Sequence, residues 1–157
     1  MTTSTSREVA AGDTFHFAGA DASTWGGALT NGQYTLNAIT FFKGWESPLH
    51  IHHREDEGLY IFSGAKEIKL GDEPLRVVRA GEFIFLPRGV PHGTRALEDG
   101  THALGIFTPP GFDKFMRELA LDFAAADFTI EKAIEGANAS GPMERYGIEI
   151  LGPFPKE

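Results

Sequence analysis

Apolar and polar residues divide this chain into two parts, with the change near Pro109 and Pro110. Before these prolines, short apolar and β-branched runs are separated by turns that contain Gly, Pro or Asp. Many short strands with such turns between them are typical of an all-β sandwich or barrel. The expected strands are residues 13–18, 33–42, 49–53, 57–62, 66–70, 76–79, 83–86, 92–97 and 102–108.

After the prolines the apolar residues recur at helical spacing. One face of the expected helix carries Phe112, Phe115, Met116, Leu119 and Phe123. A second helix is expected at 129–137, and a last turn at 143–146 precedes Gly147. We expect residues 109–157 to form a helical extension that packs on a barrel of residues 13–108, after a flexible tail at 1–12. A lid over a pocket is the alternative role for the helices.

Composition and charge exclude several classes of protein. The chain has 14 Lys and Arg against 22 Asp and Glu, a net charge of −8, and its basic residues are scattered. Nucleic-acid binding needs clustered basic residues, so we expect no nucleic-acid partner. No run of apolar residues is long enough to cross a membrane, and the start lacks the apolar region of a signal peptide. We therefore expect a cytoplasmic protein.

The absence of cysteine limits the candidate metal ligands to His, Asp and Glu. His50 and His52 are two positions apart, so both point to the same face of a strand. The charged turn at 54–56 reverses the chain and brings Glu57 beside them. The Pro- and Gly-rich turn at 87–91 delivers His92 to the head of another strand. Three imidazoles and one carboxylate inside a barrel would suit a divalent transition metal.

Three neighbouring residues compete with these four for the role of ligand. His53 points away from His52 if the strand is regular, so we expect it to face outward. Glu55 and Asp56 would replace Glu57 if the register of the hairpin slipped.

The two segments that hold these residues resemble the two motifs of the cupin superfamily. The first motif is matched by Gly44, His50, His52, Glu57 and Gly64, and the second by Gly81, Pro87, Gly89 and His92. The second motif departs at its end, where Ala96 replaces an Asn. The resemblance implies an antiparallel jelly-roll β-barrel. It also implies one divalent transition metal ion (Fe, Mn, Ni, Co, Cu or Zn) held by His50, His52, Glu57 and His92.

A further likeness bears on the reaction. The run Thr108-Pro-Pro-Gly-Phe-Asp-Lys-Phe-Met-Arg-Glu-Leu is similar to the segment after the barrel in single-domain, quercetinase-like bacterial cupins. Quercetinases open a flavonol ring with O₂, and the resemblance implies that Glu57 takes a proton from the substrate hydroxyl. We therefore expect a dioxygenase of a small aromatic or enolisable molecule. The alternatives are a non-redox isomerase or decarboxylase, and a non-catalytic ligand-binding cupin.

Strand alternation and the abundance of Phe indicate the walls of a substrate pocket. The expected contacts are Phe41, Leu59, Ile61, Phe83, Phe85, Thr94, Phe107 and Phe112. The partner expected in the pocket is a small molecule. Cupins of this kind often pair through barrel strands, so the resemblance also implies a homodimer.

Overall fold

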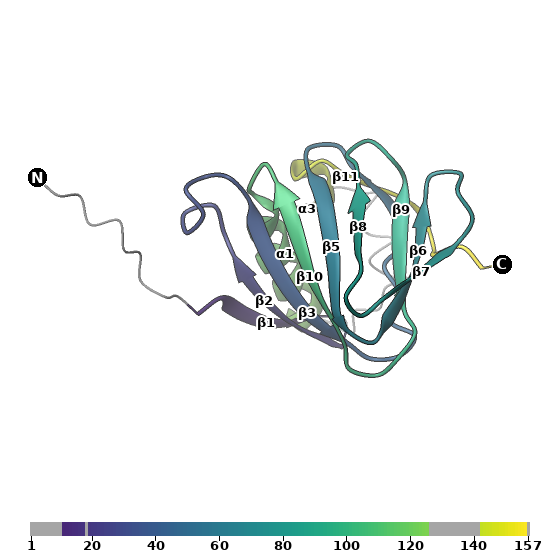
Figure 1. The fold of residues 1–157 in the computed structure, drawn as a ribbon. Helices are drawn as coiled ribbons and strands as arrows, with labels where there is room; N and C mark the ends of the chain where they lie inside the picture. Colours follow the sequence, from purple (N-terminus) through teal and green to yellow (C-terminus); the bar gives the residue numbers. More distant parts are fainter. Residues whose placement is uncertain (1–10, 18, 126–141, 157) are drawn as a thin grey trace, which may run out of the picture.

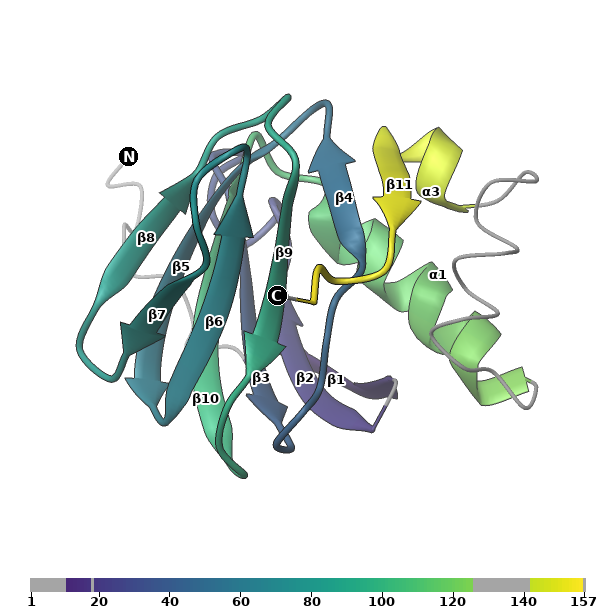
Figure 2. The same ribbon diagram turned by 90° about the vertical axis from the view of Figure 1, so that its right-hand side faces the viewer.

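The computed structural model describes residues 11–17, 19–125 and 142–156 (Figure 1). Two antiparallel β-sheets face each other, and a long helix lies at one side of the pair (Figure 2). The expected all-β jelly-roll class is confirmed, but the two sheets are not closed into a barrel. The expected tail at 1–12 lies almost wholly outside the described residues.

The larger sheet has six strands in the order β1-β2-β3-β10-β5-β8. Their bounds are Asp13–Phe17 for β1, Ala20–Trp25 for β2, Thr35–Phe41 for β3, Thr101–Thr108 for β10, Asp56–Ser63 for β5 and Phe83–Leu86 for β8. In the central strand β10, buried residues alternate with partly exposed ones from Thr101 to Phe107. One face of this sheet therefore contributes to the core.

The smaller sheet has five strands in the order β11-β4-β9-β6-β7. Their bounds are Ile148–Gly152 for β11, Leu49–His52 for β4, His92–Ala96 for β9, Ala65–Leu70 for β6 and Arg76–Arg79 for β7. In β9, His92, Thr94 and Ala96 are buried and share one face, which looks toward the larger sheet.

The expected first helix is present as α1, Phe112–Ala125, and the last expected turn is α3, Pro142–Arg145. Phe112, Phe115, Met116 and Leu119 are all buried, so the predicted apolar face of α1 does pack inward. The side chain of Phe123 and the expected helix at 129–137 lie outside the described residues. Among the described residues, no helix combines the length and the apolar character needed to cross a membrane.

Two strands were not expected from the sequence. Strand β2 pairs with both β1 and β3 in the larger sheet. Strand β11 pairs with β4, so that Ile150 lies opposite His50 and Ile148 opposite His52. The expected helical extension at 109–157 therefore contains a strand, β11, in addition to α1 and α3. The alternation of Ile148 and Ile150 with exposed Glu149 and Leu151 makes a strand here, because β4 offers an unpaired edge.

Candidate metal centre

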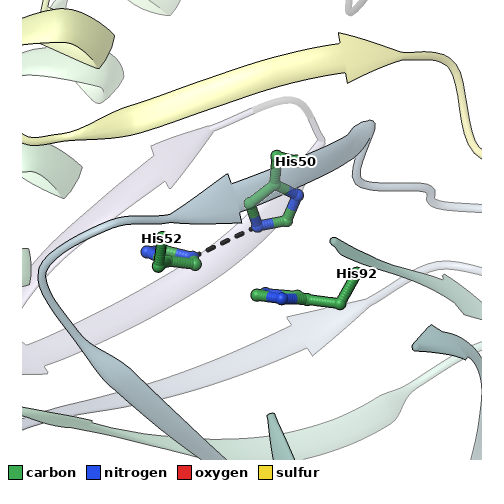
Figure 3. A group of neighbouring side chains, drawn as sticks. All are labelled: His50, His52 and His92. Carbon is green, nitrogen blue, oxygen red and sulfur yellow. Dashed lines mark hydrogen bonds between the residues drawn. The ribbon is translucent and has the colours of Figure 1, made fainter. Parts of the chain in front are cut away.

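Three histidines from two neighbouring strands meet between the sheets. His50 and His52 lie on β4, and His92 on β9 is directly opposite His50 in the strand register. Figure 3 shows the three imidazoles turned toward one another. Nε2 of His50 lies 3.2 Å from Nε2 of His52, and the three residues each offer one nitrogen within a group no more than 4.8 Å across.

Backbone carbonyls decide which ring nitrogens face the centre of this group. Nδ1 of His50 lies 2.7 Å from the carbonyl oxygen of Pro48, and Nδ1 of His92 lies 3.1 Å from that of Val90. A carbonyl oxygen only accepts hydrogen bonds, so each Nδ1 carries the hydrogen and donates it. In the neutral rings, Nε2 therefore presents its lone pair to the shared space. This is the arrangement that a metal ligand needs.

Glu57 reaches the histidines from β5 in the opposite sheet. Its Oε2 lies 3.3 Å from Nε2 of His92 and 3.7 Å from Nε2 of His52. Ligand atoms about 2.1 Å from one metal ion are separated from one another by about 3.0 to 3.4 Å in octahedral or tetrahedral geometry. The observed distances are close to this range, and Nε2 of His92 is buried without a hydrogen-bond partner among the described residues. The residues present therefore fit a divalent transition metal.

The electrostatics of the group favour a cation. Burial, with the charges of His52 and His92, lowers the pKa of His50 to about 3, so this ring is neutral and ready to bind a metal. Burial raises the pKa of Glu57, but the three imidazoles outweigh it and lower that pKa to about 2. Burial lowers the pKa of His92, as it does for His50. The adjacent Glu57 carboxylate raises this pKa by more, so the net shift is upward. A proton and a metal ion therefore compete for His92.

The competing ligands have other partners. Asp56 forms a bidentate ion pair with Arg88 at the surface. Arg88 donates from Nε to Oδ1 at 3.2 Å and from Nη2 to Oδ2 at 2.8 Å. His53 faces outward as expected, and its Nε2 lies 2.7 Å from Glu149. Glu55 is buried, but its carboxylate lies 3.6 Å from Nδ1 of His52, behind the ring. Glu55 is thus placed to orient His52 and not to reach the centre of the group.

A cavity of about 150 Å³ opens from this group, and its walls are almost entirely apolar. Five of the expected substrate contacts line it, namely Phe41, Leu59, Thr94, Phe107 and Phe112. Ile61 is fully buried but does not line the cavity. Phe83 and Phe85 are 56 % and 52 % exposed, so their expected place in the pocket is wrong. Strand β8 is apolar on both faces, and Ile84 and Leu86 are its inward residues.

The C-terminal elements form one wall of the cavity. Phe107 of β10 stacks on Phe112 of α1 with ring centroids 3.8 Å apart, and Phe112 also lies 5.2 Å from the ring of His52. Further lining comes from Phe115, Met116, Leu119, Met143, Ile148 and Ile150. The buried face of α1 thus packs against the sheets and covers the cavity at the same time.

Sequence reasoning missed four lining residues that matter for the chemistry. They are Asn37, Trp45, Lys66 and Ile150. Lys66 carried a usable signal, because it shares its strand face with Ile68 and Leu70. Ala96, where the second motif departs, pairs with Lys66 across the β6–β9 ladder and gives it a small neighbour.

Comparison with known families and proteins agrees with this site. Residues 38–107 match the family model described as a cupin domain, and this segment contains all four candidate ligands. An uncharacterised protein of Streptomyces coelicolor is 33 % identical over 58 residues, which are 37 % of this chain. The chain matches about half of that relative, 54 % of its length.

Solved structures show the same fold. KdgF from Halomonas sp. is 23 % identical, with a TM-score of 0.57 over 65 % of this chain and 92 % of the other. Oxalate oxidase in complex with the substrate analogue glycolate is 26 % identical, with a TM-score of 0.51 over 60 % of this chain and 54 % of the other. Residues 38–107 are therefore similar to a cupin domain, and the chain shares the fold of these solved structures.

Proposed function

We propose that this protein is a metal-dependent dioxygenase that acts on a small aromatic or enolisable organic molecule. The observation that carries the proposal is the meeting of three imidazole Nε2 atoms and the Glu57 carboxylate at one end of an apolar cavity. Three or four protein ligands leave open positions on a six-coordinate metal. When bound, the metal would supply a place for O₂ and for a substrate oxygen side by side.

The residues around the metal would bind and orient the substrate. Phe107 and Phe112 form a stacked aromatic wall next to His52, against which a flat apolar skeleton packs. The cavity of about 150 Å³ is the size that holds a benzene-like molecule. It is smaller than the pockets of about 300 to 1,000 Å³ that take larger ligands. These dimensions favour a single ring or a short chain over a complete flavonol.

Glu57 would move the proton. Its low pKa keeps it ionised at neutral pH, so it is able to bind a metal or to accept a proton from a substrate hydroxyl that lies against it. The likeness to oxalate oxidase with glycolate supports a small, oxygen-bearing substrate. The apolar walls beside the ligands exclude bulk water from the site of proton transfer.

Oxygen consumption tests this proposal. Metal-free protein is loaded separately with Fe(II), Mn, Co, Ni, Cu or Zn and offered catechols, β-diketones, small hydroxy acids and a flavonol. We expect substrate-dependent O₂ uptake with a redox-active metal and none with Zn. Turnover under argon would instead support a non-redox isomerase or decarboxylase. Saturable ligand binding without turnover under any condition would support a non-catalytic binding protein.

A further inference from the structure

A buried lysine faces the same cavity as the histidines. Lys66 on β6 is 2 % exposed, and its side chain enters the cavity from the smaller sheet. Its Nζ lies 3.6 Å from the centroid of the Phe41 ring and 5.2 Å from that of Trp45. The aromatic faces attract the ammonium group but provide no hydrogen-bond acceptor of full strength.

Within the described part of the chain, Lys66 has no ionic partner. No carboxylate there lies within 4.0 Å of Nζ, and no hydrogen bond to Nζ is present. Arg95, a partly buried cation of the neighbouring strand β9, is by contrast paired with Glu46 and Glu67. A buried ammonium without an anion is costly, and proteins rarely keep one without a use for it. Glu57 attracts the Lys66 ammonium electrostatically, but its carboxylate is in contact with His52 and His92.

A second unsatisfied polar group enters the cavity from the opposite sheet. Asn37 on β3 is 2 % exposed and lines the cavity, and its Oδ1 has no hydrogen-bond partner among the described residues. The two ends of an amide side chain are interchangeable by rotation, so Asn37 is able to donate as well as to accept. A buried amide with an open position points to a polar ligand group nearby.

The strand register separates Lys66 from the metal ligands along the cavity, whereas Asn37 pairs with Gly105, which pairs with Leu59, two residues from Glu57. Lys66 pairs with Ala96, and Leu70 pairs with His92, so Lys66 lies four residues along the strand from the level of His92. Four residues of strand correspond to about 13 Å between Cα atoms, and the side chains shorten this gap. One ligand can therefore contact the metal at one end of the cavity and Lys66 at the other.

We propose that Lys66 forms an anion-binding subsite, and that the molecule held in this cavity carries a carboxylate on a skeleton of about one ring. The inference deepens the proposed function by naming the class of substrate. It rests on that function only in treating the bound molecule as a substrate. Binding of an anion at the subsite does not require the proposed reaction. Lys66 donates to the carboxylate and compensates its charge, while Asn37 offers a hydrogen bond to a polar group of the same molecule nearer to Glu57.

Calorimetric binding to the full-length, Zn-loaded protein tests the subsite without any turnover. The probes are benzoate and benzyl alcohol, which match in shape and differ in charge, and the pH is about 6, where Lys66 is protonated. We expect benzoate to bind about tenfold to a hundredfold more tightly than benzyl alcohol, which is the usual strength of a charged hydrogen bond. Lys66→Met should remove this preference and leave benzyl alcohol binding unchanged.

Control variants separate the subsite from other sources of selectivity. Lys69→Met removes a lysine of the same strand whose Nζ bonds the carbonyl of Glu73 at the surface, and it should keep the wild-type preference. Lys66→Gln repeats the test with a polar side chain, in case Lys66→Met does not fold. Quenching of Trp45 fluorescence in a Trp25→Phe background places the bound benzoate in the cavity.

The outcomes distinguish the subsite from the proposed function. A benzoate preference that survives Lys66→Met and vanishes when Zn is removed would place the carboxylate on the metal and overturn the subsite. Absence of benzoate binding to the wild type would overturn it as well. Lys66-dependent binding combined with no turnover on any metal would support the subsite and count against the dioxygenase.

Discussion

The carboxylate of Glu55 lies 3.6 Å from Nδ1 of His52, on the side of the ring that faces away from Glu57. Both residues are buried, and neither of these atoms has another hydrogen-bond partner among the described residues. A slight side-chain movement turns this contact into a hydrogen bond that fixes Nδ1–H and directs Nε2 toward a metal. We therefore expect Glu55 to act as a positioning residue for His52.

Removing the Glu55 charge should weaken metal binding without abolishing it. For Glu55→Gln we expect a loss of about tenfold to a hundredfold in metal affinity, because His52 loses the group that orients it. Competition with a chelator of known affinity measures the change. Asp56→Asn alters the neighbouring acid, which pairs with Arg88 at the surface, and should leave the affinity at the wild-type value. Equal losses in both variants would argue against a specific role for Glu55.

The ligand set itself is tested by a double substitution. His50→Ala with His92→Ala should abolish stoichiometric metal binding, because the two rings come from the two strands that face each other across the group. Elemental analysis of protein purified without a polyhistidine tag is the measurement. His53→Ala removes the outward-facing histidine next to His52 and should retain full metal content. Full occupancy in the double variant would show that the ligands are elsewhere.

Acid should weaken metal binding through His92. The Glu57 carboxylate raises the pKa of His92 despite its burial, so this ring holds a proton to a higher pH than an ordinary histidine. A metal must displace that proton, and its apparent affinity should rise with pH through the raised pKa and then level off. His50 and Glu57, with pKa values of about 3 and 2, are deprotonated throughout this range. A constant affinity from about pH 5.5 to 8 would contradict this account.

Burial of Lys66 should cost stability, and the cost should depend on pH. Desolvation lowers the pKa of Lys66 from the ordinary 10.5 to about 7. The negative charge of Glu57 opposes this shift. Between these two values the unfolded chain binds one more proton than the folded chain, so folded stability rises with pH across this window. Below about pH 7 the full cost remains, on the order of 5 kcal/mol.

Lys66→Met is the variant that reveals this cost. Met has a similar shape and suits the apolar surroundings, so we expect the variant to be more stable than the wild type at pH 6. The difference in the free energy of unfolding should shrink as the pH rises from about 7 to 10. Urea denaturation at several pH values measures it. A difference independent of pH would mean that Lys66 is not a buried cation.

Strand β11 should support the metal site as well as the fold. Ile150 is 7 % exposed, lies opposite His50 in the register and lines the cavity. Ile150→Ala should destabilise the protein by about 2 to 4 kcal/mol, typical of a large-to-small change in a core, and should also weaken metal binding. Leu151→Ala changes the adjacent residue, which is 46 % exposed, and should do neither. Thermal unfolding with and without metal tests both.

The candidate metal ligands were predictable because their spacing is local. His50 and His52 share a strand face, and the turns on either side deliver Glu57 and His92 to the same space. The features that the sequence analysis did not predict depend on contacts between residues that are distant in sequence. Nothing around Ile148 shows that β4 lacks a partner, and the doubly apolar run from Phe83 to Leu86 gives no sign of which face is inward.

Lys66 shows a different limit of sequence reasoning. Its alternation with Ile68 and Leu70 is a signal for the inner face that was not used, because a lysine in a strand is usually solvent-exposed. Only the packing of Phe41 and Trp45 around Nζ shows that the charge is enclosed. The candidate metal ligands at one end of the cavity could thus be predicted from the sequence. The enclosed lysine at the other end could be recognised only from the structure.

The pairing of β11 with β4 also has a consequence for biosynthesis. During translation, the strand that carries His50 and His52 leaves the ribosome long before Ile148–Gly152 are made. Until then it is the open edge of its sheet, and the cavity lacks the wall formed by Ile148 and Ile150. A nascent chain can gather its histidines around a metal early. It can enclose a substrate-sized space only after this late strand has been added.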